Sequence, residues 1–94
     1  MLKVLTLIGT RPEIIRLSIL IKELDQYCNQ VLVHSGQNYD YELNQIFFEE
    51  LEIRKPDIFL DAVGESPAET IGNIISKIDK VLAKDSFDAF IILG

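Results

Sequence analysis

Four short apolar runs alternate along the chain with longer segments in which apolar residues recur at helical spacing. The apolar runs occupy residues 2–8, 30–35, 58–60 and 88–94. Short runs of this kind, bounded by Gly and other turn residues, indicate buried strands. The segments between them indicate amphipathic helices over residues 10–25, 41–51 and 66–82.

This alternation of strand and helix predicts a parallel sheet, because neighbouring parallel strands need crossover connections. Crossovers are right-handed, which places helices on both faces of the sheet. We expect the strand order 3-2-1-4, the first half of a doubly wound, Rossmann-like α/β fold. The 94 residues contain no linker or repeat, so residues 1–94 form at most one domain.

Composition excludes several classes of function. Apolar residues make up 48% of the chain, which supports a packed core, and 9 basic against 15 acidic residues argue against nucleic acid as the main partner. The single cysteine, Cys28, excludes an intramolecular disulfide and a cysteine-based metal cluster, and we expect it half-buried. With no visible signal peptide or membrane-spanning run, we expect a cytoplasmic protein without a membrane partner.

The first strand leads directly into "GTRPEIIRLS", residues 9–18. Thr10 and Glu13 have the spacing of a capping box, and Pro12 suits a first helical turn, so a helix begins at Thr10. Ligands of such folds bind beyond the carboxyl ends of the strands, where Gly9 allows close approach and helix amides attract anions. Arg11 adds a fork of donors suited to phosphate, and Arg16 adds charge if it reaches back. Gly94 begins the opposite lip.

The same residues have a structural interpretation. Many strand–helix loops contain Gly and a polar cap, and Arg11 could simply pair with Glu13. The loop is neither a dinucleotide-binding G-x-G-x-x-G motif nor a Walker loop, so neither NAD nor a nucleoside triphosphatase is indicated.

A second polar cluster, "HSGQNYDYE", follows the second strand and includes His34, Gln37, Asn38, Tyr39 and Asp40. These side chains could contact a sugar or a base, or could form a glycine turn and a helix cap. We favour a structural, half-buried His34 and leave Gln37 open. A lone histidine without Cys or a second His does not make a metal site, so no metal or other cofactor is expected.

Other residues receive structural interpretations. Arg54 and Lys55 suit the dipole at a helix end, and the isoleucine-rich stripe of residues 71–82 suits the core. The acidic residues of the third loop are interpreted as caps and solvated surface: Asp57, Asp61 and Glu65.

Three segments together resemble the start of the non-hydrolysing UDP-N-acetylglucosamine 2-epimerase family. They are "GTRPEIIRLS", "HSGQNYDYELNQIFFEELEIRKPD" and "AETIGNIISKIDKVL", in the family's order and spacing over the whole chain. The sequences "GQNYDYELNQIFF" and "IRKPD" are most similar to those of a subgroup that forms UDP-N-acetyl-L-fucosamine.

The resemblance implies two Rossmann-like domains in the GT-B arrangement, with a UDP-sugar between them. It implies C2 inversion by elimination and re-addition of UDP, without NAD or metal. Arg11 matches an arginine that contacts the diphosphate, and Arg16 a position, often Lys, near the phosphates. Gln37 matches a residue that helps bind a second, activating UDP-sugar, although Asn38 and Asp40 depart from the residues usual there.

The family's acid–base carboxylates and histidine lie beyond this sequence, the first directly after "IILG". We therefore expect residues 1–94 to be the incomplete N-terminal part of a homodimeric enzyme, with no catalytic residue and no activity alone. The expected substrate-binding residues are Gly9, Thr10, Arg11, Pro12, Glu13 and Arg16. A non-catalytic nucleotide- or anion-binding regulatory module is the alternative, and an uncovered fourth strand predicts self-association.

Overall fold

The computed structural model describes residues 2–92, apart from the side chain of Asn38, and has the predicted α/β architecture. Four parallel strands form one sheet in the order β3-β2-β1-β4, which confirms the predicted order. The strands are β1 (Lys3–Ile8), β2 (Asn29–His34), β3 (Ile58–Phe59) and β4 (Ala89–Ile91). The helices are α1 (Arg11–Tyr27), α2 (Asn38–Leu43), α3 (Gln45–Glu50) and α4 (Pro67–Lys84).

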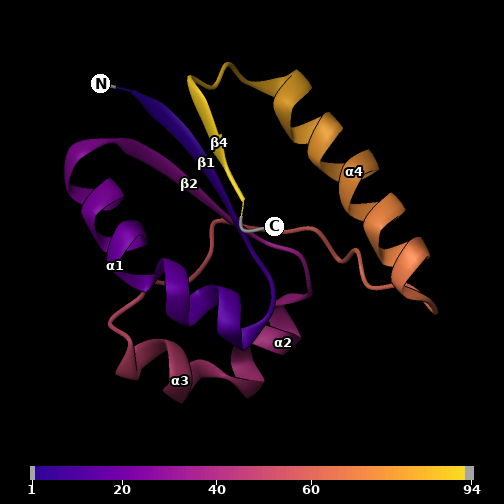
Figure 1. Cartoon of the computed structure of the whole chain (residues 1–94), viewed down its shortest axis with the longest axis horizontal. Coiled ribbons are helices and arrows are strands. Elements are labelled where there is room, and N and C mark those ends of the chain that lie inside the picture. Colours follow the sequence, from indigo (N-terminus) through magenta and orange to yellow (C-terminus); the bar gives the residue numbers. More distant parts are fainter. Residues whose placement is uncertain (1, 93–94) are drawn as a thin grey trace.

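Helices cover both faces of the sheet, with α1, α2 and α3 on one side and α4 on the other (Figure 1). Side chains of β1 alternate between the two resulting cores. On the α1 side, Ile8 joins a buried cluster with residues such as Ile14, Ile21 and Phe48. On the α4 side, Leu5 and Leu7 pack in a second cluster that includes Ile78. The sheet therefore depends on β1, which contributes to both cores.

The helices α1 and α4 begin where the sequence predicts. Thr10 has extended backbone and begins α1, as predicted, and the Ser66 hydroxyl oxygen caps α4 by accepting from the Glu69 amide at 3.1 Å. Among the described helices, none is long and apolar enough to cross a bilayer. Cys28 is half-buried and free, as expected.

The predicted single helix over residues 41–51 is wrong, because two short helices meet at Asn44. This residue has φ −115° and ψ 18°, outside the helical range, and is both the C-cap of α2 and the N-cap of α3. The Asn44 side chain donates to the Asp40 carbonyl at 2.8 Å. Such bonding to nearby backbone competes with a continuous helix.

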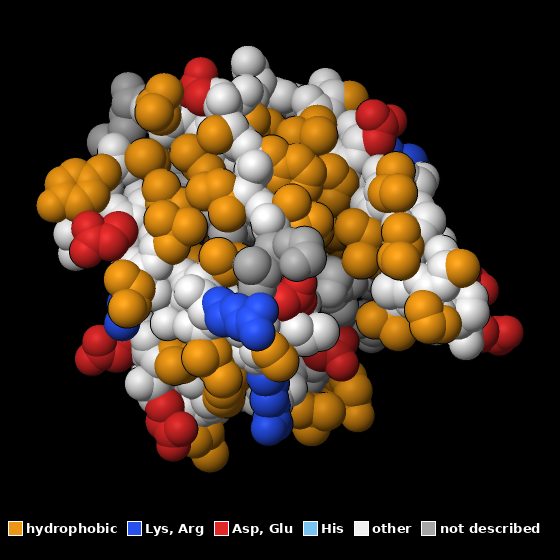
Figure 2. Space-filling model, viewed as in Figure 1, with side chains coloured by type: hydrophobic (Ala, Val, Ile, Leu, Met, Phe, Trp, Pro, Cys, Tyr) orange, Lys and Arg blue, Asp and Glu red, His pale blue; other side chains and the backbone are white. Residues whose placement is uncertain are grey.

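The α4 stripe is only partly core. Ile78 is buried, but Ile71 and Ile75 are 58% and 67% exposed, and Phe90 on β4 is 41% exposed. A groove between α4 and β4 is lined by side chains including Leu7, Ile75, Ile78, Phe90 and Ile92. Figure 2 shows apolar side chains along α4 and over the neighbouring surface. Self-association through this surface stays a prediction, supported by this apolar exposure.

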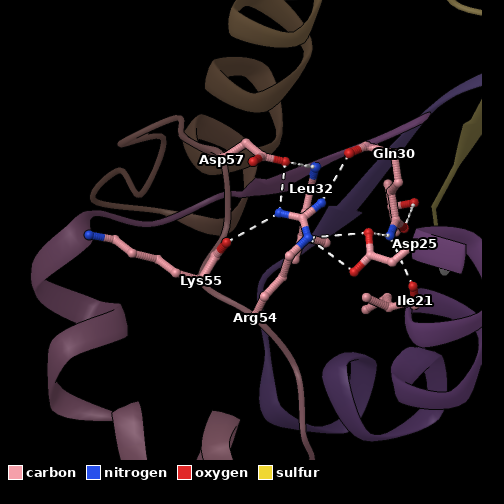
Figure 3. A network of polar contacts seen from close by, with 8 residues as sticks. Ile21, Asp25, Gln30, Leu32, Arg54, Lys55 and Asp57 are labelled. Carbon is pink, nitrogen blue, oxygen red and sulfur yellow. Dashed lines mark hydrogen bonds and ion pairs between the residues drawn. The ribbon is translucent and has the colours of Figure 1, made fainter.

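Arg54 has a structural role, as predicted, but it acts through hydrogen bonds and ion pairs that join three parts of the chain (Figure 3). Its Nε donates to both oxygens of Asp25 on α1, at 3.2 and 3.0 Å, and its Nη2 donates to the Gln30 carbonyl on β2 at 3.0 Å. Its Nη1 lies 2.9 Å from Asp57, whose carboxylate also accepts from the Leu32 amide at 2.8 Å. Asp57 is therefore a structural ion-pair partner and not merely solvated surface.

Burial opposes the charge on Arg54, but its hydrogen bonds to Asp25 and Asp57 outweigh that cost and raise its pKa. The network also includes two buried polar side chains on the α1 side of the sheet, Gln30 and Thr6. Gln30 Nε2 donates to Asp25 and to the Ile21 carbonyl, and Gln30 Oε1 accepts from the Thr6 hydroxyl at 2.7 Å. These contacts connect α1, β1, β2 and the segment before β3.

Replacing Arg54 by Met should lower the free energy of unfolding by about 1–2 kcal/mol, because two carboxylates and a carbonyl lose a charged donor. This destabilisation is smaller than for a fully buried ion pair, because the Arg54 side chain is 35% exposed and water partly screens its ion pairs. Urea unfolding followed by circular dichroism measures the change. Lys80→Ala, at an exposed position on α4, is the control. Equal stability of the Arg54 variant and the control would contradict a structural role for this network.

Candidate functional site

A cavity of about 190 Å³ lies where β1 and β2 end, at the edge of the sheet where the sequence placed a ligand. Strand pairing explains its position, because Ile8 and His34, the last residues of β1 and β2, are partners in register. The lining comes from the loops after both strands and from the helices that follow: Gly9, Arg11, Ile14, His34, Ser35, Gly36, Asp40, Asn44, Phe47, Phe48 and Val63.

Arg11 lies at this cavity and is held from the side by the turn between α2 and α3. Its Nη2 donates to Asn44 Oδ1 at 2.7 Å, and its Cζ lies 5.4 Å from the centroid of the Phe47 ring. Arg11 therefore does not pair with Glu13, the structural alternative considered from the sequence. Its other guanidinium donors have no protein acceptor among the described residues, so they are available to an anion.

Glu13 occupies the start of α1 instead. Its Oε1 accepts from the Thr10 amide at 2.8 Å and from the Thr10 hydroxyl at 3.0 Å. Pro12 has no amide hydrogen to offer. The bond from the Thr10 amide to Glu13 confirms the predicted capping box, and it leaves this amide occupied. A guanidinium suits an anion better than a single amide, so Arg11 is the stronger candidate for binding an anion.

Gly9 approaches the loop after β2 closely. A Cβ at this position would lie 2.5 Å from Ser35 Oγ, so a larger residue would require the Ser35 side chain to change rotamer. Arg16 is exposed on α1, outside the cavity lining, and has no ion-pair partner in the described part of the chain. Gly94, predicted as the opposite lip, lies outside the described residues.

Gln37 does not line the cavity that Arg11 lines; it lines a separate pocket together with Tyr39 and Asp61. Its Nε2 donates to Asp61 Oδ1 at 2.6 Å. Asp61 has φ 52°, in the left-handed region, and is held there because its amide donates to the Gly36 carbonyl and its carbonyl accepts from Lys77 Nζ. Asp61 is exposed, as predicted, but hydrogen bonds to its backbone fix its conformation and its carboxylate already accepts from Gln37.

His34 is more deeply placed than the predicted half-buried position, with 6% of its surface exposed. Burial lowers its pKa, although the negative charges of Asp40 and Glu13 oppose this. Among the described residues, no group of three His, Cys, Asp or Glu side chains is arranged to hold a metal ion.

Sequence reasoning missed Asn44 and Phe47 as partners of Arg11. The signal available was an asparagine inside a helical pattern, since Asn disfavours helix interiors and favours caps. Its distance of 33 residues from Arg11 gave no indication of the contact.

Comparison with known proteins identifies the chain's relatives. A family profile described as UDP-N-acetylglucosamine 2-epimerase matches residues 22–94. The chain belongs to the UDP-N-acetylglucosamine 2-epimerase family. This confirms the resemblance seen in the three sequence segments.

Family members of known structure have the same fold over this region. UDP-N-acetylglucosamine 2-epimerase from Rickettsia bellii is 52% identical, with a TM-score of 0.86 over 96% of this chain and 24% of that one. UDP-GlcNAc 2-epimerase from Methanocaldococcus jannaschii, in complex with UDP-GlcNAc and UDP, is 34% identical, with a TM-score of 0.80 over 95% of this chain and 25% of that one. These enzymes have the GT-B fold.

Among curated proteins, UDP-2,3-diacetamido-2,3-dideoxy-D-glucuronate 2-epimerase from Pseudomonas aeruginosa is 35% identical over 99% of this chain and 27% of its own length. The chain thus spans about a quarter of the length of the relatives that it matches.

Two glycines in this family member provide a paired stability test. A Cβ at Gly36 would lie 2.6 Å from Asp40 Oδ2 and 3.1 Å from His34 Cε1, whereas at Gly72, on the exposed side of α4, it would meet nothing within 4 Å. Gly36→Ala should destabilise the fold by about 1–3 kcal/mol through crowding. Gly72→Ala should stabilise it by about 0.5–1 kcal/mol through helix propensity. Chemical unfolding of both variants measures the difference, and a neutral Gly36→Ala would show that the turn has room to spare.

Proposed function

We propose that this chain is the incomplete N-terminal part of a UDP-N-acetylglucosamine 2-epimerase, in which it holds the diphosphate of a UDP-sugar. The observation that carries the proposal is Arg11 at the cavity, fixed by Asn44 and Phe47 with donors still available. A fork of charged donors held in one geometry suits two phosphate oxygens. Family membership supplies the reaction class, C2 epimerisation of a UDP-N-acetylhexosamine.

The size of the cavity supports a diphosphate rather than a whole nucleotide sugar at this position. Binding sites for complete small molecules usually measure about 300–1,000 Å³, and this cavity measures about 190 Å³. The sugar and the base would extend beyond Arg11 towards a part of the enzyme that this chain does not include. Such an arrangement agrees with a substrate cleft between two domains.

Arg11 would act as an electrostatic stabiliser, not as an acid or base. Elimination of UDP breaks the bond between C1 of the sugar and the phosphate oxygen, and negative charge develops on the departing diphosphate. A guanidinium already aimed at that charge lowers the barrier without reorganising in the transition state. Gly9 would allow the phosphate to approach, and Thr10, Pro12 and Glu13 would shape the loop that presents Arg11.

Arg16 would contribute through longer-range attraction, since it is exposed and lies outside the cavity lining. A second, activating UDP-sugar site at Gln37 requires a ligand that displaces Asp61 or binds beside it, because Asp61 already accepts from Gln37. Cytoplasmic location and a homodimer of the complete enzyme are further parts of the proposal.

Arg11→Ala should weaken the binding of UDP-GlcNAc by about 10²-fold, the loss expected for a pair of charge-assisted hydrogen bonds. Isothermal titration calorimetry measures the dissociation constant. Lys80→Ala, an exposed charge change on α4, controls for net charge and should bind as the native chain does. Unchanged affinity in the Arg11 variant would remove this residue from the site.

The 94-residue chain alone should form no C2 epimer from UDP-GlcNAc, because the proposal places every acid–base group elsewhere in the enzyme. Each such group contributes about 10²- to 10⁴-fold to the rate. Proton NMR of the sugar anomeric region after prolonged incubation detects any product. Epimer above the no-protein control would show that catalytic groups lie within these residues. Binding without turnover, by a natural protein that ends here, would favour the alternative of a non-catalytic nucleotide-binding module.

A further inference from the structure

His34 is buried beside the cavity and takes no part in the function described so far. It ends β2 and lies among aromatic rings, with its ring centroid 6.4 Å from that of Phe48 on α3 and 5.7 Å from that of Phe59 on β3. Its exposed fraction is 6%, so the ring has little freedom to turn.

The ring is bonded to the turn that follows it. His34 Nδ1 accepts a hydrogen bond from the Gly36 amide at 2.8 Å. An imidazole nitrogen accepts only when it carries no proton, so this contact requires the neutral ring with its hydrogen on Nε2. A proton on Nδ1 would face the Gly36 amide hydrogen and abolish the bond.

This turn forms one wall of the cavity that contains Arg11, through Ser35 and Gly36. Two side chains hold its successive amides, since Gln37 N donates to Asp40 Oδ2 at 2.6 Å next to the bond between Gly36 and His34. The space is tight, because even a methyl group on Gly36 would collide with Asp40. Loss of either acceptor therefore changes the wall of the cavity.

Charged groups reach His34 from two directions. Asp40 on α2 and Glu13 on α1 raise its pKa, but the larger effect of burial lowers it. Arg11 on α1 lines the same cavity, and Tyr41 on α2 packs on Phe48 and Phe59. The phenyl rings of Phe48 on α3 and Phe59 on β3 pack against His34 itself. Since the unfolded chain takes up this proton at a higher pH, acid also lowers stability below about pH 6.5.

We propose that neutral His34 is a positioning residue for the UDP-sugar site, holding the turn at residues 35–37 in the shape that the diphosphate requires. Gain of a proton by His34 releases Gly36 and weakens binding. This inference rests on the proposed function, because it names what shapes the same cavity.

The proposal makes a prediction opposite to that of simple charge attraction. A protonated histidine that contacted the diphosphate would strengthen binding as the pH falls. If only the neutral form binds, the apparent dissociation constant rises up to tenfold for each pH unit below the pKa of His34. UDP-GlcNAc is the suitable probe, since its diphosphate is esterified at both ends and lacks the terminal phosphate ionisation near pH 6.

Calorimetric titration of the chain with UDP-GlcNAc between pH 8 and pH 5 tests this, with circular dichroism at each pH to show that the chain stays folded. The native dissociation constant should rise only as the pH falls below the pKa of folded His34, which burial places below its ordinary value of 6.5. His34→Asn offers a non-titrating acceptor near the Nδ1 position, so its dissociation constant should stay within a few-fold of the native value at pH 8 and lose the acid dependence. A native affinity that rises in acid, or a His34→Asn variant with the native pH profile, would overturn the proposal.

NMR of the native chain without UDP-sugar provides an independent measurement, which still decides the matter if His34→Asn does not fold. The Gly36 amide resonance should titrate with the same midpoint as the His34 ring nitrogens, whereas the Gly72 amide on exposed α4 should not. A Gly36 amide insensitive to His34 protonation refutes the positioning role. Failure of UDP-GlcNAc to bind at any pH refutes the proposed function instead, while the Gly36 titration still reports on the bond to His34.

Discussion

The parallel pairing of β1 with β2 is the constraint on which the rest of this structure depends. It places Ile8 opposite His34, so the loops that leave the two strands emerge side by side at one edge of the sheet. Arg11 follows the first strand and Gly36 the second, and both line the same cavity although 25 positions separate them. Backbone hydrogen bonds maintain this arrangement, including that from the Ser35 amide to the Ile8 carbonyl at 2.9 Å.

The site is built from neighbours that restrain one another. Arg11 is held by Asn44, and Asn44 is itself bonded to the Asp40 carbonyl, while the Asp40 carboxylate accepts from the amide of Gln37. A cation restrained in this way loses little entropy on meeting an anion, which is the physical advantage of preorganisation. On the α4 face of the sheet, by contrast, the groove between α4 and β4 is lined mainly by apolar side chains, with Asp79 beside them.

Much of the fold follows from local sequence. Alternating strand and helix patterns were sufficient for the sheet order, because parallel strands require crossovers and crossovers have one hand. Thr10 and Ser66 marked the helix starts correctly, since capping is a local interaction within one turn. Local reasoning failed where a side chain bonds far along the chain. Arg54 seemed suited to a helix end but pairs with Asp25, 29 residues away, and the helical pattern around Asn44 concealed a break.

The sequence by itself determined the fold class, because periodicity and caps are local properties. It also predicted the edge of the sheet at which a ligand would bind and the proposed role of Arg11 in binding an anion, because the charge of a guanidinium is a local property too. Only the tertiary structure decided that Arg11 is bonded to Asn44 instead of Glu13, that His34 is buried and accepts from Gly36, and that part of the α4 stripe stays exposed. These outcomes depend on which surfaces meet when the helices pack on the sheet. Packing brings together residues whose spacing along the chain carries no information about their contact.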